Sequence, residues 1–155
     1  IMVCEPESAQ ILTSGIEQEH NPDGSNNGSH PEFNPHVMQG WSPDFILRLA
    51  ECTVSRSLVD GYVAVAEQNS LQCARDLATR EGVFVGISSG ATLAGAMEIA
   101  KSAPSGSNIL CMMPDTGERY LTTVLFDHIN SEMNDDEVAL SNSTPGYQFD
   151  LQAAI

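Results

Sequence analysis

GISSGA at residues 86–91 and PDTGERYL at residues 114–121 decide the fold of this chain. Each run follows a short apolar stretch, at residues 83–85 and 109–113, and each precedes a segment with helical character. Repetition of a strand, a turn rich in glycine or serine and a helix is how α/β proteins build a pocket at the carboxyl ends of parallel strands. The two runs therefore predict an α/β fold with a site where they meet.

The pattern along the rest of the chain extends this prediction to a partial sheet. We expect four strands, at residues 1–5, 62–65, 83–85 and 109–113. We expect helices or helical turns at residues 8–12, 45–49, 69–80, 91–101 and 120–129, with Gly82 ending the third of them. Alternating strands and helices predict a parallel sheet with helices on its faces. Four strands make only part of such a sheet, so one edge needs a cover.

The composition separates a folded region from an acidic tail. Residues 1–129 carry the α/β pattern, and residues 130–155 are polar and acidic. Residues 17–35 are rich in Asn, Gly, Ser, Pro and acids without periodicity, which predicts an exposed insertion that is mobile unless something holds it. Three histidines lie in or beside it: His20, His30 and His36. We expect no functional metal there.

Charge and cysteine usage exclude some classes of protein. The chain has 155 residues, of which 41% are hydrophobic, and a formal net charge of −15. Nucleic-acid binding needs clustered Lys and Arg, so we exclude it. The charge fits either a solvated acidic surface or a basic partner. No apolar run is long enough to span a membrane. The four cysteines have no metal-binding spacing, which favours an intracellular, reducing compartment such as the cytoplasm or a plastid: Cys4, Cys52, Cys73 and Cys111.

Four motifs in order carry a family resemblance. They are IMVCEP at 1–6, HVMQG at 36–40, EGVFVGISSGA at 81–91 and PDTGERYL at 114–121. Together they resemble the C-terminal half of cysteine synthase (O-acetylserine sulfhydrylase), a member of the fold-type II pyridoxal-phosphate-dependent family. The resemblance runs from residue 1 to about residue 129. It implies half of a fold-type II enzyme and pyridoxal phosphate as cofactor.

The resemblance implies a cofactor role for the two serines of the first run. In the family, the serine at the position of Ser88 hydrogen-bonds the pyridine nitrogen of the cofactor, and a neutral hydroxyl there makes a weaker electron sink than a carboxylate partner would. Ser89 would shape the turn, and Gly90 would let the next helix pack closely. The structural alternative is an ordinary helix N-cap at Ser88 or Ser89.

Three further residues belong to the implied cofactor site. Gly40 lies in a loop that the family places beside cofactor and substrate, and its structural alternative is a turn glycine before a proline. Asp115 and Thr116 would complete the floor of the pocket by hydrogen bonds. Glu118 and Arg119 are interpreted as structural, capping and bracing the last helix.

The residues that the family uses for covalent chemistry have no counterpart here. The resemblance implies a Schiff-base lysine and a phosphate-binding loop in an N-terminal half, and the single lysine, Lys101, has no matching motif. We therefore assign no catalytic residue to this chain and expect it neither to bind the cofactor nor to act alone.

Three functional interpretations follow. The first is the C-terminal part of an enzyme that makes cysteine from O-acetylserine and sulfide. The second is a non-catalytic, cysteine synthase-like structural subunit of a larger assembly. In both, a missing N-terminal half or a protein partner covers the open sheet edge. The third, weaker interpretation rests on the terminal Ile155, because the family binds a serine acetyltransferase peptide that typically ends in isoleucine.

Overall fold

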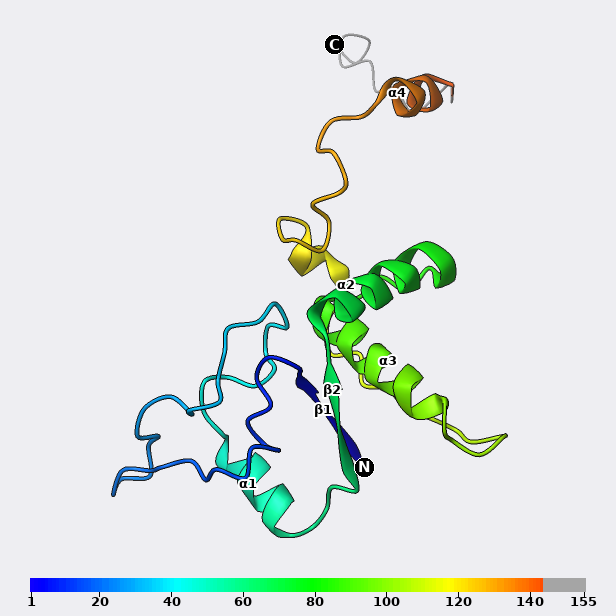
Figure 1. Ribbon diagram of the computed structural model, residues 1–155. Coiled ribbons are helices and arrows are strands. Elements are labelled where there is room, and N and C mark those ends of the chain that lie inside the picture. Colours follow the sequence, from blue (N-terminus) through cyan, green and yellow to red (C-terminus); the bar gives the residue numbers. More distant parts are fainter. Residues whose placement is uncertain (144–155) are drawn as a thin grey trace, which may run out of the picture.

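The computed structural model describes residues 1–143, which contain a small two-stranded parallel sheet with helix α3 (Ile87–Ala100) packed on it (Figure 1). Strand β1 (Met2–Pro6) pairs with β2 (Gly61–Val65), with Met2 opposite Gly61 and Pro6 opposite Val65. The crossover between them contains α1 (Arg48–Ser55). No helix in the described part of the chain is long and apolar enough to cross a membrane.

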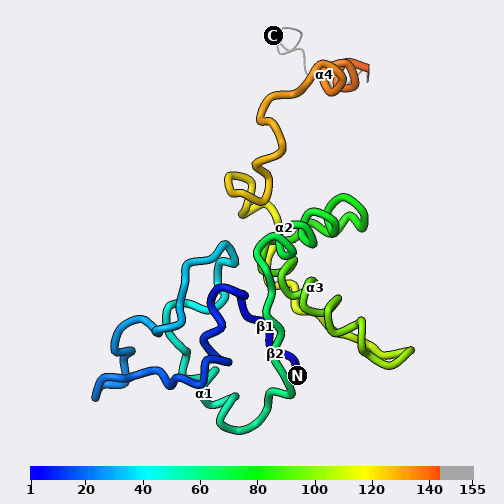
Figure 2. Tube along the Cα trace, in the orientation of Figure 1, coloured from blue at the N-terminus to red at the C-terminus, as the bar shows by residue number. Residues whose placement is uncertain are grey.

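Two helices follow β2 and pack against each other beside the sheet. Helix α2 (Glu67–Asp76) continues into a π-helical turn (Leu77–Glu81), and α3 (Ile87–Ala100) runs alongside it (Figure 2). Gly82 ends the first helical segment with a φ of 69°, a left-handed conformation that favours glycine. The predicted helix end at Gly82 is confirmed.

The hydrophobic core joins the sheet to the start of α3 and to the segment that follows it. Its fully buried members come from five separate stretches of chain: Met38, Val65, Ala74, Val85, Ile87, Ala91, Tyr120 and Leu125. The PDTGERYL run therefore packs on the same core as the GISSGA run, although the two are separated in sequence by the rest of α3 and a loop.

The mixed α/β fold with a partial parallel sheet is confirmed, but the predicted number of strands is wrong. Residues 83–85 form only an isolated antiparallel bridge, between Val85 and Thr116. Residues 109–113 form no strand, and within them Leu110 is 99% exposed. A strand needs a neighbouring strand whose backbone completes its hydrogen bonds. The described residues provide no such neighbour for residues 109–113.

The predicted helices were correct in the middle of the chain and wrong at its two ends. Residues 8–12 and 121–129 form turns, and the second run supplies only a short 3-10 helix (Gly117–Tyr120). The helical turn expected at 45–49 begins later, as α1. Helix α4 (Asp135–Asn142) lies within the predicted tail, away from the core (Figure 1). Residues 144–155, including the C-terminal isoleucine, lie outside the described residues.

Residues 17–35 are held by specific hydrogen bonds. The side chain of Gln18, 7% exposed, accepts from the amide of Ile46 at 3.1 Å. His30, 2% exposed, donates its amide to the carbonyl of Asp44 at 2.6 Å. His20 Nε2 lies 2.8 Å from the Glu51 carboxylate. The predicted insertion is exposed at most positions, and the buried Gln18 and His30 and the half-buried His20 tie it to the loop before α1 and to α1 itself.

Candidate functional site

The buried start of α3 places the two candidate serines. Gly86 is the N-cap residue, so Ser88 and Ser89 lie within the first turn, 3% and 0% exposed. Neither serine caps the helix, and the structural alternative of an N-cap at Ser88 or Ser89 is wrong. Their burial requires another explanation, because a buried hydroxyl is costly without a partner.

Backbone hydrogen bonds bring the second run against this helix start. The amide of Gly86 donates to the carbonyl of Asp115 at 3.3 Å, and the amide of Gly117 donates to the carbonyl of Phe84 at 3.2 Å. Together with the bridge from Val85 to Thr116, these bonds place Asp115 beside the N-terminus of α3. The structure thus brings Asp115 and Thr116 to the start of α3, the helix whose first turn carries Ser88 and Ser89.

Tyr120 belongs to this cluster and was not among the predicted site residues. Its hydroxyl donates to Asp115 Oδ2 at 2.7 Å, and the residue is 4% exposed. A Cβ on Gly86 would come under 3.0 Å from both the Asp115 carboxylate and the Tyr120 ring. Both side chains therefore pack directly over the backbone at the start of α3.

Burial and the neighbouring carboxylate change the acidity of Tyr120. Desolvation of the phenol, the hydrogen bond to Asp115 and the negative charge of Asp115 raise the pKa of Tyr120 to about 12. A hydrogen bond from Ser88 and the positive charge of Arg119 act in the opposite direction. The Tyr120 phenol and the Asp115 carboxylate therefore act as one coupled pair.

This shift predicts a specific loss of stability in alkali. A phenol whose folded pKa lies above its unfolded value of about 10 contributes stability that is complete below pH 10 and is lost as the pH rises through 12. Between these limits the free energy of unfolding should fall by about 2–3 kcal/mol more in the parent protein than in Tyr120→Phe. Denaturant titrations at several pH values measure the difference. Tyr62→Phe should keep the parent slope, and parallel curves for the parent and Tyr120→Phe would contradict the assignment.

Two buried polar atoms of this cluster have no partner among the described residues. They are Ser89 Oγ and Asp115 Oδ1. Buried polar atoms are almost always paired in folded proteins, so unpaired ones indicate a place for a polar ligand. Hydroxyls and a carboxylate at a helix start suit the heteroaromatic ring of a cofactor such as pyridoxal phosphate. The cluster therefore fits the ring end of that cofactor.

The side chain of Thr116 interacts with a residue close to it in the sequence. Its hydroxyl hydrogen-bonds the exposed Glu118 carboxylate, which lowers the pKa of Glu118. The predicted contribution of Thr116 to the floor of a pocket remains a prediction.

Gly40 lies in a tight turn with a φ of 85°, and a Cβ there would meet no atom within 4 Å. The amide of Trp41 closes this turn on the carbonyl of Met38 at 3.1 Å. Backbone conformation therefore requires glycine here, as the interpretation as a turn glycine predicted. Met38, at the start of this turn, packs in the same hydrophobic core as Ile87.

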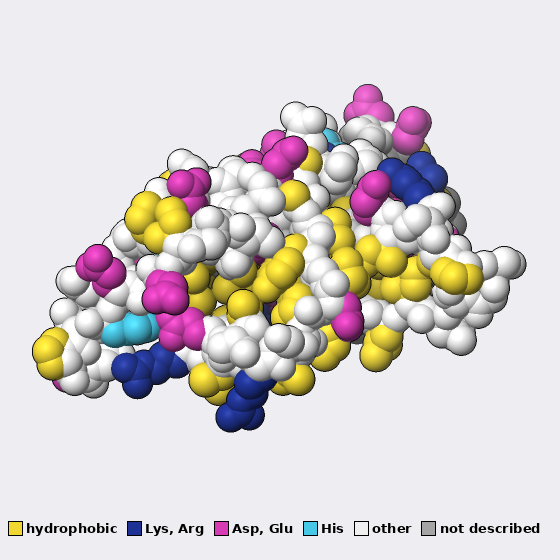
Figure 3. All heavy atoms as spheres, turned by 60° about the horizontal axis from the view of Figure 1, so that its bottom comes forward, with side chains coloured by type: hydrophobic (Ala, Val, Ile, Leu, Met, Phe, Trp, Pro, Cys, Tyr) yellow, Lys and Arg dark blue, Asp and Glu magenta, His cyan; other side chains and the backbone are white. Residues whose placement is uncertain are grey.

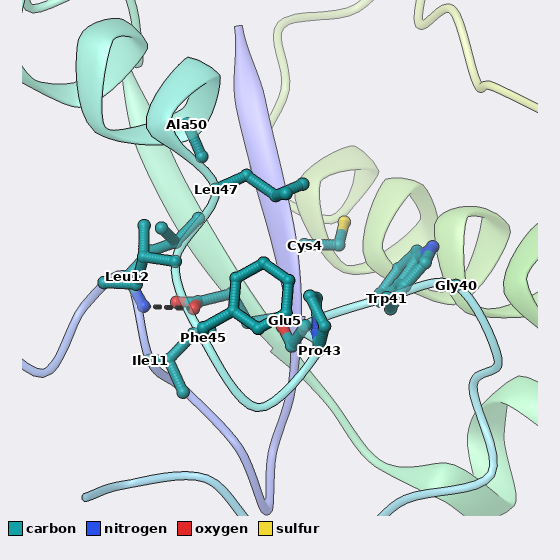
Figure 4. Close-up of a pocket in the computed structure, with 12 residues that line it drawn as sticks. Cys4, Glu5, Ile11, Leu12, Gly40, Trp41, Pro43, Phe45, Leu47 and Ala50 are labelled. Carbon is teal, nitrogen blue, oxygen red and sulfur yellow. Dashed lines mark hydrogen bonds between the residues drawn. The ribbon is translucent and has the colours of Figure 1, made fainter. Parts of the chain in front are cut away.

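A hollow of about 230 Å³ lies beside Gly40 (Figure 4), and Ser88 is not among the residues that line it. Cys4 and Glu5 of β1, Trp41 and Phe45 of the loop, and Leu47 line it. The carboxylate of Glu5, which is 1% exposed, accepts from the Leu12 amide at 2.6 Å and from the Thr13 hydroxyl at 2.9 Å. Gly40 thus lines this hollow, and Ser88 does not.

The comparisons with known proteins assign the family. Residues 1–115 match the family described as pyridoxal-phosphate dependent enzyme, and the chain belongs to that family. It is 36% identical over 146 residues to O-ureido-L-serine synthase of Streptomyces lavendulae, which covers 94% of this chain and 39% of the relative. It is 30% identical over 126 residues to cysteine synthase of Staphylococcus aureus, covering 81% and 34%.

Solved structures agree with this assignment. The crystal structure of O-ureido-L-serine synthase matches with a TM-score of 0.68 and 38% identity, over 89% of this chain and 37% of that one. O-acetyl serine sulfhydrylase isoform 3 from Entamoeba histolytica matches with a TM-score of 0.64 and 28% identity, over 86% and 34%. The chain is thus similar to part of fold-type II enzymes, and spans less than two fifths of the length of the curated relatives described above.

Proposed function

We propose that this chain supplies the ring-binding part of the active centre of a pyridoxal-phosphate-dependent enzyme that replaces a substituent on the β-carbon of a serine derivative. The products named for the two relatives, O-ureido-L-serine and cysteine, are both alanines that carry a heteroatom on the β-carbon. Cysteine formation from O-acetylserine and sulfide is the specific reaction we propose. The observation that carries the proposal is the buried Ser88 in the first turn of α3, together with two buried polar atoms that have no partner among the described residues, Ser89 Oγ in the same turn and Asp115 Oδ1 beside the helix start.

Each residue of the cluster has a stated task in this proposal. When bound, pyridoxal phosphate withdraws electrons from the amino acid, which makes the β-substituent easier to expel. Ser88 hydrogen-bonds the ring nitrogen and fixes the plane of the ring, while Ser89 and Asp115 offer their free polar atoms to the same end of the site. Burial of Ser88, Ser89 and the Oδ1 atom of Asp115 keeps water from competing for these bonds.

The residue that holds the cofactor covalently must come from outside α3. Lys101, the single lysine of the sequence, follows the last turn of α3, about 20 Å along the helix axis from Ser88. It is exposed and forms an ion pair with Glu98. On this proposal the chain alone does not catalyse, and a further stretch of polypeptide completes the site.

Exposed apolar surface supports the need for that further polypeptide. Leu110, Met112 and Met97 are 99%, 73% and 59% exposed, and apolar side chains gather on the face shown in Figure 3. Exposed apolar area of this kind is typical of a surface that another element covers. We propose that an N-terminal half or a protein partner pairs with residues 109–113.

Cofactor binding and turnover test the proposed function. In the assembly of this chain with the polypeptide that completes the site, Ser88→Ala should weaken pyridoxal phosphate binding about tenfold, the value of one hydrogen bond of about 1.4 kcal/mol, and should lower cysteine formation. Cofactor fluorescence and a cysteine assay with O-acetylserine and sulfide measure both. Ser105→Ala, in an exposed loop, is the control. Unchanged affinity and turnover in Ser88→Ala would reject the role of this serine, and a parent protein without cofactor would favour the structural subunit.

A further inference from the structure

Arg75, near the end of α2, binds the chain that follows the second run. Its Nε atom donates to the carbonyl oxygen of Leu125 at 2.8 Å, and its Nη2 atom donates to the carbonyl oxygen of Val124 at 2.7 Å. The same Nη2 atom donates to the Asp127 carboxylate at 3.1 Å. A planar guanidinium holds several donors in a fixed arrangement, so one side chain can bind two neighbouring carbonyls and a carboxylate. These three contacts form the Arg75 clamp.

Hydrogen bonds connect the Arg75 clamp to Tyr120. The carbonyl oxygen of Tyr120 accepts from the amide of Thr123 at 2.9 Å and from its hydroxyl at 2.7 Å. The amide of Leu125 donates to the same hydroxyl oxygen at 3.4 Å, and Leu125 is fully buried. A displacement of Leu125 would therefore break bonds that fix Tyr120.

Two packing contacts give the Arg75 clamp a rigid base. Helix α2 lies directly against α3, because a Cβ at Gly90 would come under 3.0 Å from backbone atoms of α2. The ring of Phe126, which follows the two clamped carbonyls, packs on the ring of Phe84 with centroids 5.4 Å apart. Phe84 also accepts, through its carbonyl oxygen, the amide of Gly117 at 3.2 Å. The second run is thus held at its start by residues 84–86 and after its end by α2.

We propose that Arg75 is a positioning residue of the cofactor site, because the Arg75 clamp keeps the second run, and with it the Asp115 carboxylate, against the start of α3. This inference rests on the proposed function, which places the ring of pyridoxal phosphate at that helix start. Arg75 acts through the bonded chain from Leu125 to Tyr120 and through the bond from the Tyr120 hydroxyl to Asp115 at 2.7 Å. Loss of the clamp should therefore loosen the site without removing any group that touches the cofactor.

The arrangement of donors, and not the charge alone, explains the clamp. Arg75→Lys keeps the positive charge, but an ammonium is a point charge on a flexible stem and cannot hold both carbonyls in the fixed arrangement of the guanidinium. Asp127→Asn keeps both carbonyl bonds and weakens only an ion pair whose carboxylate side chain is 65% exposed, and exposed pairs contribute little. Arg80→Gln removes the ion pair with Asp76 from the helical turn after α2. The last two variants are therefore the controls.

Amide hydrogen exchange and cofactor binding test the inference in the assembly of this chain with the polypeptide that completes the site. In Arg75→Gln the Gly117 amide, which bonds to Phe84, should exchange about tenfold faster than in the parent, while amides in the middle of α3 keep the parent rate. Pyridoxal phosphate binding should weaken about tenfold. Arg75→Lys should change both quantities in the same direction, and the two controls should leave both within about twofold of the parent.

Local exchange separates positioning from a general loss of stability. A merely structural role would speed exchange in α3 and at Gly117 alike, and that result overturns the inference. So does a parent rate at Gly117, a parent cofactor affinity in Arg75→Gln, or an Arg75→Lys protein that matches the parent in both. If Arg75→Gln does not fold, Arg75→Lys, which keeps the charge, supplies the comparison.

The proposed function is tested separately by the parent. A parent assembly that binds no pyridoxal phosphate overturns the proposed function and the inference with it. Parent binding together with any of the contrary results above overturns the inference alone and leaves the proposed function intact.

Discussion

Replacing Gly90 by alanine is expected to lower the free energy of unfolding by about 3 kcal/mol or more. A Cβ at Gly90 would come under 3.0 Å from the carbonyl oxygen of Ser70 and the amide nitrogen of Ala74, which are backbone atoms of α2. Backbone cannot rotate away as a side chain can, so α2 and α3 must separate. Overpacking of this kind typically costs 1–3 kcal/mol and costs more where the backbone itself must move.

Gly106→Ala is the matched control for this substitution. Gly106 has a φ of 84° and open space around its Cα, so alanine there costs only the left-handed conformation, about 1–2 kcal/mol. Denaturant unfolding of both variants measures the difference. A Gly90→Ala protein no less stable than Gly106→Ala would show that α2 and α3 do not pack as closely as described.

The close packing at Gly90 illustrates what the sequence could predict. Small residues after a glycine-serine turn indicated a helix that packs closely, and Gly82 indicated where the preceding helix ends. The helix start was placed four residues too late, at residue 91 instead of Ile87. Serine is a common N-cap, so Ser88 and Ser89 suggested a boundary, whereas Gly86 is the N-cap and the first turn is buried.

The missing strands show a limit of hydrophobic patterns. An apolar run such as residues 109–113 fits a buried strand, yet a strand exists only when a neighbouring backbone pairs with it.

Helix α4 shows the opposite error, because the signal for this helix was present in the sequence and was not used. Asn134 and Glu137 form a capping box, the spacing that typically marks a helix start, within a segment interpreted only as a tail.

The hydrogen bond between Tyr120 and Asp115 could not be predicted from the periodicity of the sequence. Asp115 and Tyr120 are five residues apart and would not face each other on a regular helix. They meet because the chain forms a short 3-10 turn at Gly117–Tyr120, held by the bond from the Gly117 amide to Phe84. The sequence therefore predicted that the two runs meet, whereas the contact between Asp115 and Tyr120 inside the second run is visible only in the fold.

Gly86→Ala is expected to separate the Tyr120 phenol from the Asp115 carboxylate at the proposed cofactor site, while most of the fold stays in place. Its Cβ would overlap both the Asp115 carboxylate and the Tyr120 ring, which must then move apart. The phenol loses its bond to Asp115 while its burial, the largest cause of the raised pKa, remains, so the pKa of Tyr120 should fall below about 12 by the share that Asp115 contributes. Pyridoxal phosphate binding should weaken by at least tenfold, since Ser88 loses a fixed neighbour and Asp115 is displaced.

Gly95→Ala provides a control for crowding in the same helix. Gly95 lies further along α3 than Gly86. A Cβ there would overlap the sulfur of Cys4 in β1, without touching Tyr120 or Asp115. Both variants carry a similar steric cost, but only Gly86→Ala should change the ultraviolet titration of the phenol. If the two variants shift that titration equally, or if neither does, the coupling between Gly86, Tyr120 and Asp115 is wrong. A change confined to Gly86→Ala means that the second run is positioned by the absence of a side chain at this one residue.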